Sequence, residues 1–200
     1  MMKRGHLIVI SGPSGVGKGT IVREVRKNRA NLRFSISATT REKRPSEVDG
    51  REYYFLSKTQ FEDLIARNAL LEHATYVDNY YGTPAEPVDQ ALAEGYDVLL
   101  EIEVVGGLQV KKNRPDAVLI FVAAPSMAEL KHRLVGRGDT DPARVEKRLA
   151  RAKEEYEFIP EYDYVVVNDT VEQATEDVLT ILKANEHRAR FMAELLKEEP

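Results

Sequence analysis

The sequence contains no cysteine, and its four histidines are scattered along the chain at positions 6, 73, 132 and 187. The absence of cysteine excludes disulfides, thiolate zinc sites and cysteine nucleophiles. The histidines show neither an HxH nor an HxxxH spacing, so a histidine metal cluster is not expected. Any catalysis must therefore rest on other side chains.

Long apolar runs and a strong charge excess are also missing. The longest unbroken apolar run, residues 117–124, is too short to cross a bilayer. Residues 7–10, which follow Lys3 and Arg4, are too few for the core of a signal peptide. Lys and Arg number 29 against 33 Asp and Glu, a formal charge of −4, which argues against a general nucleic-acid coat. We therefore expect a cytoplasmic protein that binds neither membranes nor nucleic acid.

The order of apolar runs and helical signals predicts an α/β fold. The chain has 200 residues, of which 42% are hydrophobic, enough for one compact unit with a real core. Four short apolar runs are typical of buried parallel strands: residues 7–10, 98–100, 118–122 and 164–167. Helical patterns follow three of them, at residues 18–27 and behind capping boxes that begin at Ser126 and Thr170.

Two segments interrupt the alternation of strands and helices. Residues 36–83 predict a small antiparallel sheet with one helix, opened by residues 59–62. Residues 126–162 are strongly helical and rich in Arg and Glu, and Asp141-Pro142 is a helix start within them. Such excursions from a core commonly carry substrate-binding groups and lids.

The sharpest motif lies between the first predicted strand and the first predicted helix, which is the context of a phosphate loop. Glycines let backbone N–H groups point inward, the helix N-terminus adds positive potential, and a lysine adds a full charge. The strict motif has Ser or Thr directly after the lysine, whereas here the hydroxyl comes one residue later, where it can approach Mg²⁺ or phosphate. The loop consists of Gly12, Pro13, Ser14, Gly15, Val16, Gly17, Lys18, Gly19 and Thr20.

A phosphate loop alone is compatible with kinases, GTPases, motors and transport ATPases, but further strings narrow the choice. They are residues 37–45 (SATTREKRP), 47–53 (EVDGREY), 71–72 (LE), 79–83 (NYYGT), 98–103 (VLLEIE), 134–138 (LVGRG), 146–149 (EKRL) and 166–169 (VVND). In order and spacing, over nearly the whole chain, they resemble the guanylate kinase family. The resemblance implies the α/β fold of P-loop nucleoside-monophosphate kinases, with a parallel sheet flanked by helices. It implies a core of residues 1–36, 85–125 and 163–200, a GMP-binding insertion of residues 37–84 and a helical lid of residues 126–162.

The resemblance also assigns the GMP-binding residues. Guanine offers N1–H and a 2-amino group as donors and O6 as an acceptor, so a carboxylate at Glu72 can accept from both donors. Adenine would leave that carboxylate unpaired, at a cost of about 1–3 kcal/mol. The remaining implied contacts are O6 for Ser37 and Thr83, the guanine edge for Glu103 (commonly Asp in the family), and the GMP phosphate for Arg41, Arg44, Tyr53 and Tyr81. Read locally, Thr83 is also a helix N-cap before Pro84, and Glu72 is an ordinary surface carboxylate.

An acidic strand end and the arginine-rich segment complete the implied site. Glu101, at a position where the family usually has Asp, would orient Mg²⁺ through water. Arg137 and Arg148 would close on the transferred phosphoryl group, with Arg137 and Asn168 near adenine. Arg133 matches the family less distinctively and also reads as part of a solvated helix face.

The implied reaction is ATP + GMP ⇌ ADP + GDP, with Mg²⁺ as cofactor and ATP and GMP, or dGMP, as substrates. Lys18, Arg41, Arg44, Arg137 and Arg148 would supply the catalytic positive charge. Three alternatives stay open: a kinase for AMP or another monophosphate, a guanylate-kinase-like peptide-binding module, and a GTPase. Such modules usually lack a working phosphate loop, and the Asn-Lys-x-Asp signature of GTPases is absent. The sequence does not separate a monomer from a homodimer.

Overall fold

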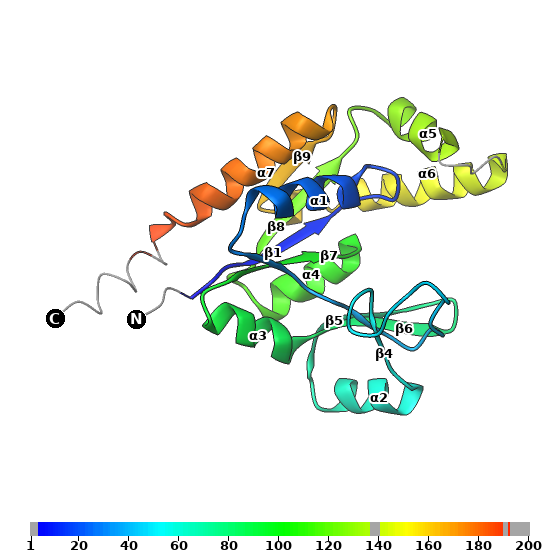
Figure 1. Ribbon diagram of the computed structural model, residues 1–200. Helices are drawn as coiled ribbons and strands as arrows, with labels where there is room; N and C mark the ends of the chain where they lie inside the picture. The colour runs from blue at the N-terminus through cyan, green and yellow to red at the C-terminus, as the bar shows by residue number, and fades with distance from the viewer. Residues whose placement is uncertain (1–3, 137–140, 190–191, 193–200) are drawn as a thin grey trace. The chain divides into compact units, whose positions relative to one another are not determined.

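The computed structural model describes residues 4–136, 141–189 and 192 (Figure 1). Its main sheet has five strands. Their order is β2-β7-β1-β8-β9, and β2 pairs with β7, and β8 with β9, in parallel. The bounds are Leu7–Ser11 for β1, Leu32–Phe34 for β2, Asp97–Glu101 for β7, Val118–Ala123 for β8 and Tyr164–Val167 for β9. The four predicted strands are confirmed, whereas β2 was not predicted.

A second sheet of four strands, in the order β4-β3-β6-β5, lies within residues 38–84. Its strands are β3 (Ala38–Thr39), β4 (Tyr54–Phe55), β5 (Leu70–Tyr76) and β6 (Asn79–Pro84). Strand β6 runs antiparallel to both β3 and β5. The expectation of a purely antiparallel sheet is wrong at one pair, because β3 and β4 are parallel. The long connection between them, residues 40–53, allows this, since parallel strands need a crossover rather than a tight turn.

Most helices begin close to where the sequence predicts them, whereas the helix over residues 104–113 was not predicted. They are α1 (Lys18–Asn28), α2 (Lys58–Ala66), α3 (Ala85–Ala93), α4 (Val104–Asn113), α5 (Met127–Gly136), α6 (Pro142–Tyr156) and α7 (Val171–Asn185), with a short 3-10 helix at Ile159–Glu161. The side chains of Ser126, Asp141 and Thr170 each accept a backbone N–H at the start of α5, α6 and α7. These three helix starts are confirmed.

Two local predictions of helix starts are wrong. Helix α2 begins at Lys58, before the predicted Thr59, because Ser57 and Gln60 form a reciprocal capping box. Helix α3 has Pro84 at its N-cap, and Thr83 belongs to strand β6 instead. The hydroxyl of Thr83 is engaged by a side chain of the neighbouring strand, so it does not cap the helix.

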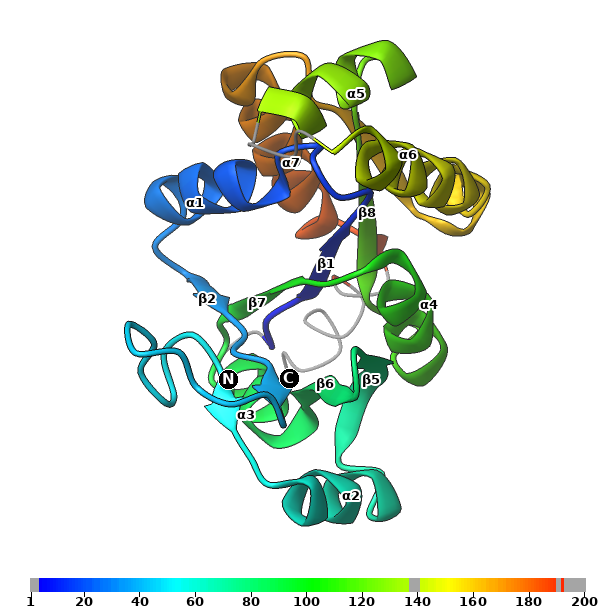
Figure 2. The same ribbon diagram turned by 90° about the vertical axis from the view of Figure 1, so that its right-hand side faces the viewer.

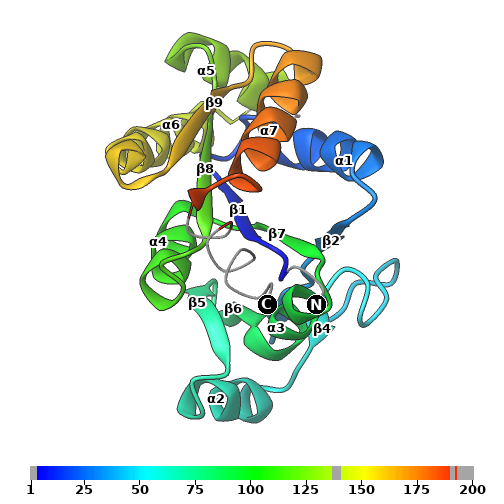
Figure 3. The same ribbon diagram turned by 90° about the vertical axis from the view of Figure 1, so that its left-hand side faces the viewer.

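The chain divides into two compact units, and the division crosses strands β1 and β8. We call residues 10–30 together with the described part of 120–200 the phosphate-loop unit, in which α1 packs against α7 and α5 against α6 (Figure 3). Within it, the ring of Phe121 makes edge-on contacts with the rings of Tyr156 and Tyr162, at centroid distances of 5.5 and 5.2 Å. The predicted division into core, insertion and lid stays a prediction.

The described residues up to Val9, together with residues 31–119, form the other unit, which we call the small-sheet unit. There, helix α2 covers the four-stranded sheet (Figure 2) through a cluster built on Ala38, Phe61 and Leu70. Tyr80 stacks on Phe61 with ring centroids 5.3 Å apart, which anchors β6 to the helix. Among the described residues, no helix is long and apolar enough to cross a membrane.

Candidate functional site in two parts

The backbone of the predicted phosphate loop is fixed by glycines at two tight positions. Gly12 has a φ of +141°, and a Cβ there would lie 2.2 Å from the carbonyl oxygen of Val122 on β8. Gly17 has a φ of +96°, and a Cβ there would lie 2.4 Å from the amide nitrogen of Asn168. Because residues with a side chain rarely adopt these angles and no space is left, both positions require glycine.

Asn168 and Arg133 hold this loop from outside it. Nδ2 of Asn168 donates to the carbonyl oxygen of Val16 at 2.7 Å, and the residue is only 3% exposed. Arg133 donates from Nη1 to the carbonyl oxygen of Asn168 at 2.9 Å and from Nε to Glu129 at 2.7 Å. Arg133 is therefore a connector between α5 and the end of β9, and the interpretation of it as part of a solvated face is wrong.

Two cations lie at the loop within the phosphate-loop unit. Nζ of Lys18 donates to the carbonyl oxygens of Gly12 and Pro13, at 2.5 and 3.0 Å. Nη2 of Arg148, from α6, donates to the hydroxyl of Ser14 at 2.5 Å. The structure thus brings the loop, Lys18 and Arg148 together at the start of α1, as an anion site requires. The predicted Arg137 lies outside the described residues.

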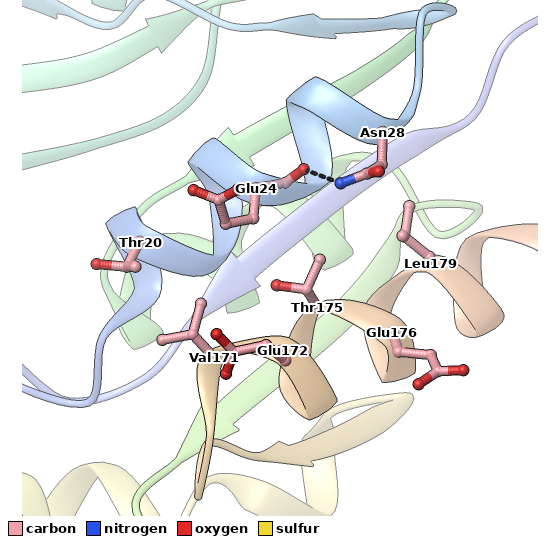
Figure 4. Close-up of a pocket in the computed structure, with 8 residues that line it drawn as sticks. All are labelled: Thr20, Glu24, Asn28, Val171, Glu172, Thr175, Glu176 and Leu179. Carbon is pink, nitrogen blue, oxygen red and sulfur yellow. Dashed lines mark hydrogen bonds between the residues drawn. The ribbon is translucent and has the colours of Figure 1, made fainter.

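Thr20 lies in the first turn of α1 and lines a cavity that is separate from the rest of the phosphate loop. A cavity of about 600 Å³ between α1 and α7 is lined by Thr20, Glu24, Asn28, Val171, Glu172, Thr175, Glu176 and Leu179 (Figure 4). Three of these side chains are carboxylates, which would repel a polyphosphate. The cavity is therefore unsuited to the nucleotide, and the phosphate loop remains the candidate site.

In the small-sheet unit, the predicted guanine-binding pair forms a buried contact. The hydroxyl of Thr83 on β6 donates to Oε1 of Glu72 on β5 at 2.7 Å. Glu72 is 7% exposed, so the interpretation of it as a surface carboxylate is wrong. Burial raises the pKa of Glu72; the Thr83 hydroxyl opposes this rise, and the negative charge of Glu103 adds to it.

The start of helix α4 limits the space around this carboxylate. A Cβ on Gly106 would lie 3.0 Å from Oε2 of Glu72, so the carboxylate rests against a residue without a side chain. Glu103 is the exposed N-cap of the same helix, and Glu101 is the half-buried last residue of β7. The short segment from the last residue of β7 to the first turn of α4 therefore carries both predicted acidic positions and Gly106, against which Glu72 lies.

The predicted phosphate-binding groups gather on the same small sheet. Tyr81 and Thr83 are two residues apart on β6, so their side chains share a face of the sheet. The ring of Tyr53 lies edge-on to that of Tyr81 at 6.1 Å, and the guanidinium of Arg41 lies 5.6 Å from the centre of the Tyr53 ring. Contact with Glu47, and to a smaller degree with Tyr81, raises the pKa of Arg41 above its ordinary value.

The remaining predicted residues are less enclosed. Ser37 is half-buried just before β3, and its carbonyl oxygen accepts from the backbone N–H of Tyr54 at 2.9 Å. Arg44 has an exposed side chain, while its backbone N–H donates to Oε2 of Glu47 at 2.9 Å. Sequence reasoning did not single out Glu47, Gly106 or the structural role of Arg133. A carboxylate close to two arginines in one loop was the available signal for Glu47.

Comparison with known proteins shows the family to which this chain belongs. A family model described as guanylate kinase matches residues 4–185. The chain belongs to the guanylate kinase family. It is 51% identical over 185 residues to a guanylate kinase of Lactiplantibacillus plantarum, which covers 92% of this chain and 90% of that protein. A guanylate kinase of Thermus thermophilus is 52% identical over 194 residues, which covers 97% of this chain and 88% of that protein.

A solved structure agrees with these sequence relatives. The crystal structure of guanylate kinase from Anaplasma phagocytophilum matches 99% of this chain and 96% of its own, with a TM-score of 0.77 and 29% sequence identity. The predicted family and the predicted fold, a parallel sheet flanked by helices, are both confirmed.

Proposed function

We propose that this member of the guanylate kinase family transfers the γ-phosphoryl group of ATP to GMP, giving ADP and GDP, through the residues described above. The observation that supports GMP as the acceptor is the buried pair of Glu72 and Thr83. Thr83 lies two residues along β6 from Tyr81. A buried carboxylate needs donors, and guanine offers two of them side by side, at N1 and at the 2-amino group.

Guanine binding changes the electrostatic state of this pair. Without a ligand, burial raises the pKa of Glu72, because the ionised carboxylate has lost water. Two donors from guanine restore hydrogen bonds to the ionised form, whereas N1 of adenine offers no proton. A hydroxyl carries a single proton, and that of Thr83 is directed at Glu72. Thr83 therefore orients the carboxylate, and donation from Thr83 to guanine O6 requires its hydroxyl to rotate.

The GMP phosphate is assigned to Arg41, Arg44, Tyr53 and Tyr81. An arginine fork matches two phosphate oxygens, and a phenol donates a hydrogen bond without adding charge. The rings of Tyr53 and Phe55 lie beside Arg41, with their centres 5.6 and 5.7 Å from its Cζ. With this assignment, residues of the small-sheet unit bind both the base and the phosphate of GMP.

ATP is assigned to the phosphate-loop unit. The N–H groups at the start of α1 and the ammonium of Lys18 face the β- and γ-phosphates, and the lysine exchanges its bonds to two loop carbonyls for bonds to phosphate oxygens. Arg148, which already touches Ser14, adds charge on the γ side. Arg137 and Asn168 are proposed near adenine. Asn168 also keeps the loop in shape through Val16.

In this mechanism, a phosphate oxygen of GMP attacks the γ-phosphorus of ATP in line, and ADP leaves. That oxygen is already anionic near neutral pH, so no general base is needed. The barrier arises largely from repulsion, since two unit charges 4 Å apart interact by about 4 kcal/mol at an effective dielectric of 20. Lys18, Arg41, Arg44, Arg137 and Arg148 offset this repulsion, and binding in a fixed orientation supplies much of the remaining acceleration.

The side chains available for Mg²⁺ are hard oxygen donors of the right type. Thr20 offers a hydroxyl and Glu101 a carboxylate, and oxygen ligands are what Mg²⁺ prefers. No cluster of three or more metal-binding side chains occurs among residues 4–136, 141–189 and 192. Mg²⁺ would therefore be held mainly by nucleotide phosphates and water, with Thr20 and Glu101 as outer contacts, and it would neutralise charge on the transferred group.

The direct test is a coupled assay of ADP release with ATP, Mg²⁺ and GMP, dGMP, AMP, CMP or UMP in turn. We expect turnover with GMP, slower turnover with dGMP, and little with the others. Faster turnover with AMP than with GMP would contradict the assignment of Glu72 and Thr83. Binding of ATP and GMP without any turnover would favour the peptide-binding module. A cytoplasmic location stays a prediction, as does the pair of alternatives, a monomer or a homodimer.

A further inference from the structure

Glu47, in the loop between β3 and β4, is bound to both predicted phosphate-binding arginines. Nη2 of Arg41 donates to its two carboxylate oxygens, at 2.8 and 3.0 Å. The backbone N–H of Arg44 donates to Oε2 at 2.9 Å, and the N–H of Glu47 donates back to the carbonyl oxygen of Arg44 at 3.0 Å. The Glu47 side chain is only 12% exposed, and these contacts lower its pKa. It is therefore held as a carboxylate.

The other sides of the Arg41 guanidinium are also occupied. Nη1 donates to the carbonyl oxygen of Glu42 at 2.7 Å. The rings of Tyr53 and Phe55 lie with their centres 5.6 and 5.7 Å from Cζ. A guanidinium has five N–H donors, so these contacts fix its plane while using only part of its hydrogen-bonding capacity. Arg41 is thereby oriented before any ligand arrives.

The charges of this loop explain why a carboxylate is needed. Arg41, Lys43 and Arg44 place three positive charges within four residues, against one negative charge on the exposed Glu42 between them, and the remaining repulsion favours splayed, solvated side chains. Glu47 offsets part of that repulsion. It also fixes the backbone at Arg44, because its carboxylate accepts a hydrogen bond from the Arg44 backbone N–H at 2.9 Å. A carboxylate tied to both a side chain and the backbone is anchored, rather than a mobile occupant of the phosphate position.

We propose that Glu47 is a positioning residue for the GMP phosphate, which acts by holding Arg41 and the turn at Arg44 in the orientation that receives it. This proposal rests on the proposed function, in which Arg41 binds that phosphate. The opposite role would be a gate, in which Glu47 competes with the phosphate for Arg41. The two roles predict opposite signs for the effect of removing its charge.

The experiment compares Glu47→Gln with Glu42→Gln, which removes the same charge from an exposed side chain of the same loop and leaves in place the backbone carbonyl oxygen through which Glu42 contacts Arg41. Affinities for GMP and for guanosine, which lacks the phosphate, are measured by calorimetry, together with the KM for ATP. For Glu47→Gln we expect GMP affinity to fall by about tenfold to a hundredfold, with guanosine affinity and the KM for ATP unchanged. Glu42→Gln should match the wild type within about twofold.

Two further variants make the result independent of folding defects. Glu47→Asp keeps the charge on a shorter arm, so its affinity for GMP should fall between those of the wild type and Glu47→Gln, with equal melting temperatures as the check on folding. In an Arg41→Ala background, Glu47→Gln should have a much smaller effect on GMP affinity than it has alone, since the side-chain part of the role of Glu47 is exerted through Arg41.

The outcomes separate this proposal from the proposed function. If Arg41→Ala leaves GMP affinity unchanged, the assignment of the phosphate site fails. If Arg41→Ala weakens GMP binding but Glu47→Gln strengthens it or leaves it unchanged, the positioning role alone is overturned. An equal loss for guanosine and GMP would also overturn it, because it would indicate general damage to the small sheet.

Discussion

The two candidate nucleotide sites of this chain are built in different ways. The phosphate loop is shaped by backbone: Gly12 and Gly17 have positive φ angles and leave no space for a Cβ. The acceptor site is shaped by side chains, with Arg41 held by Glu47 and Glu72 held by Thr83. A backbone-built site should fail as a whole when one glycine changes. A site built from side chains should lose function in steps, one contact at a time.

Lys18→Ala should have the largest effect and should separate the two sites. The ammonium of Lys18 is the full charge inside the loop, so its removal should lower kcat by roughly 10²–10³-fold while GMP affinity stays near that of the wild type. Lys27→Ala, at the exposed end of the same helix, is the matched control. An unchanged kcat for Lys18→Ala in the ADP-release assay would contradict the ATP assignment.

Gly12→Ala tests whether the loop depends on its backbone. The new Cβ would meet the carbonyl oxygen of Val122, which is strand backbone and has little freedom to move. We expect a loss of about 1–3 kcal/mol in the free energy of unfolding and a loss of ATP binding. Gly136→Ala, where nothing lies within 4 Å of the new Cβ, should melt like the wild type. Equal melting temperatures for the two variants would argue against a strained, crowded loop.

Glu72→Gln tests the acceptor site by its selectivity. The glutamine oxygen can still accept from Thr83, but its amide group presents a donor where guanine needs an acceptor. The preference for GMP over AMP should fall by about 1–3 kcal/mol in relative kcat/KM, with the KM for ATP unchanged. A preference equal to that of the wild type would remove Glu72 from base recognition.

The same variant has a predictable pH dependence. Burial raises the pKa of Glu72 above the ordinary value of 4.5, so the folded chain holds this proton more tightly than the unfolded chain does. The associated stability is present below pH 4.5 and is lost as pH rises through the folded-state pKa. Relative to the wild type, Glu72→Gln should therefore gain unfolding free energy as pH increases above 4.5. Denaturant titrations at several pH values check this, with Glu86→Gln, an exposed change on α3, as the control.

Arg133→Gln should have the smallest effect, because it weakens the support of the loop without touching the loop itself. The carbonyl oxygens of Asn168 and Asp169 would lose a charged donor, which is worth about 1 kcal/mol in a partly exposed position. We expect a few-fold increase in the KM for ATP and no change in GMP affinity. Lys131→Gln, exposed on the same helix, is the control. A matching rise in both variants would assign the effect to helix charge.

The same contrast explains how much of the molecule was predictable. The position of the glycine-rich loop between the first strand and the first helix, and four of the main strands, were predicted correctly because their signals are local: closely spaced glycines and unbroken apolar runs. Strand β2 was missed because Leu32–Phe34 has only three residues, one of them charged. The additional interpretation of Thr83 as a helix cap was wrong, because the Thr-Pro pattern is local, whereas the contact with Glu72 joins residues eleven positions apart across the hairpin.

The support of both sites depends on contacts that no regular helix or strand spacing reveals. Asn168 reaches Val16 across 152 positions, and only folding brings them together. Arg41 and Glu47 are six residues apart, a spacing that matches neither the helix nor the strand period. The residues proposed to bind the substrates could be assigned from the family resemblance, whereas the residues that support them required coordinates.

Gly106 carries a lesson for anyone who wishes to redesign base selectivity. Gly106 has no side chain, and a Cβ there would lie 3.0 Å from Oε2 of Glu72. The space available to the side chain at position 72 therefore depends on this glycine. A longer, shorter or differently charged side chain at position 72 would meet the same backbone at Gly106. Engineering of a new purine preference therefore starts at the first turn of α4, before the base-reading position itself is changed.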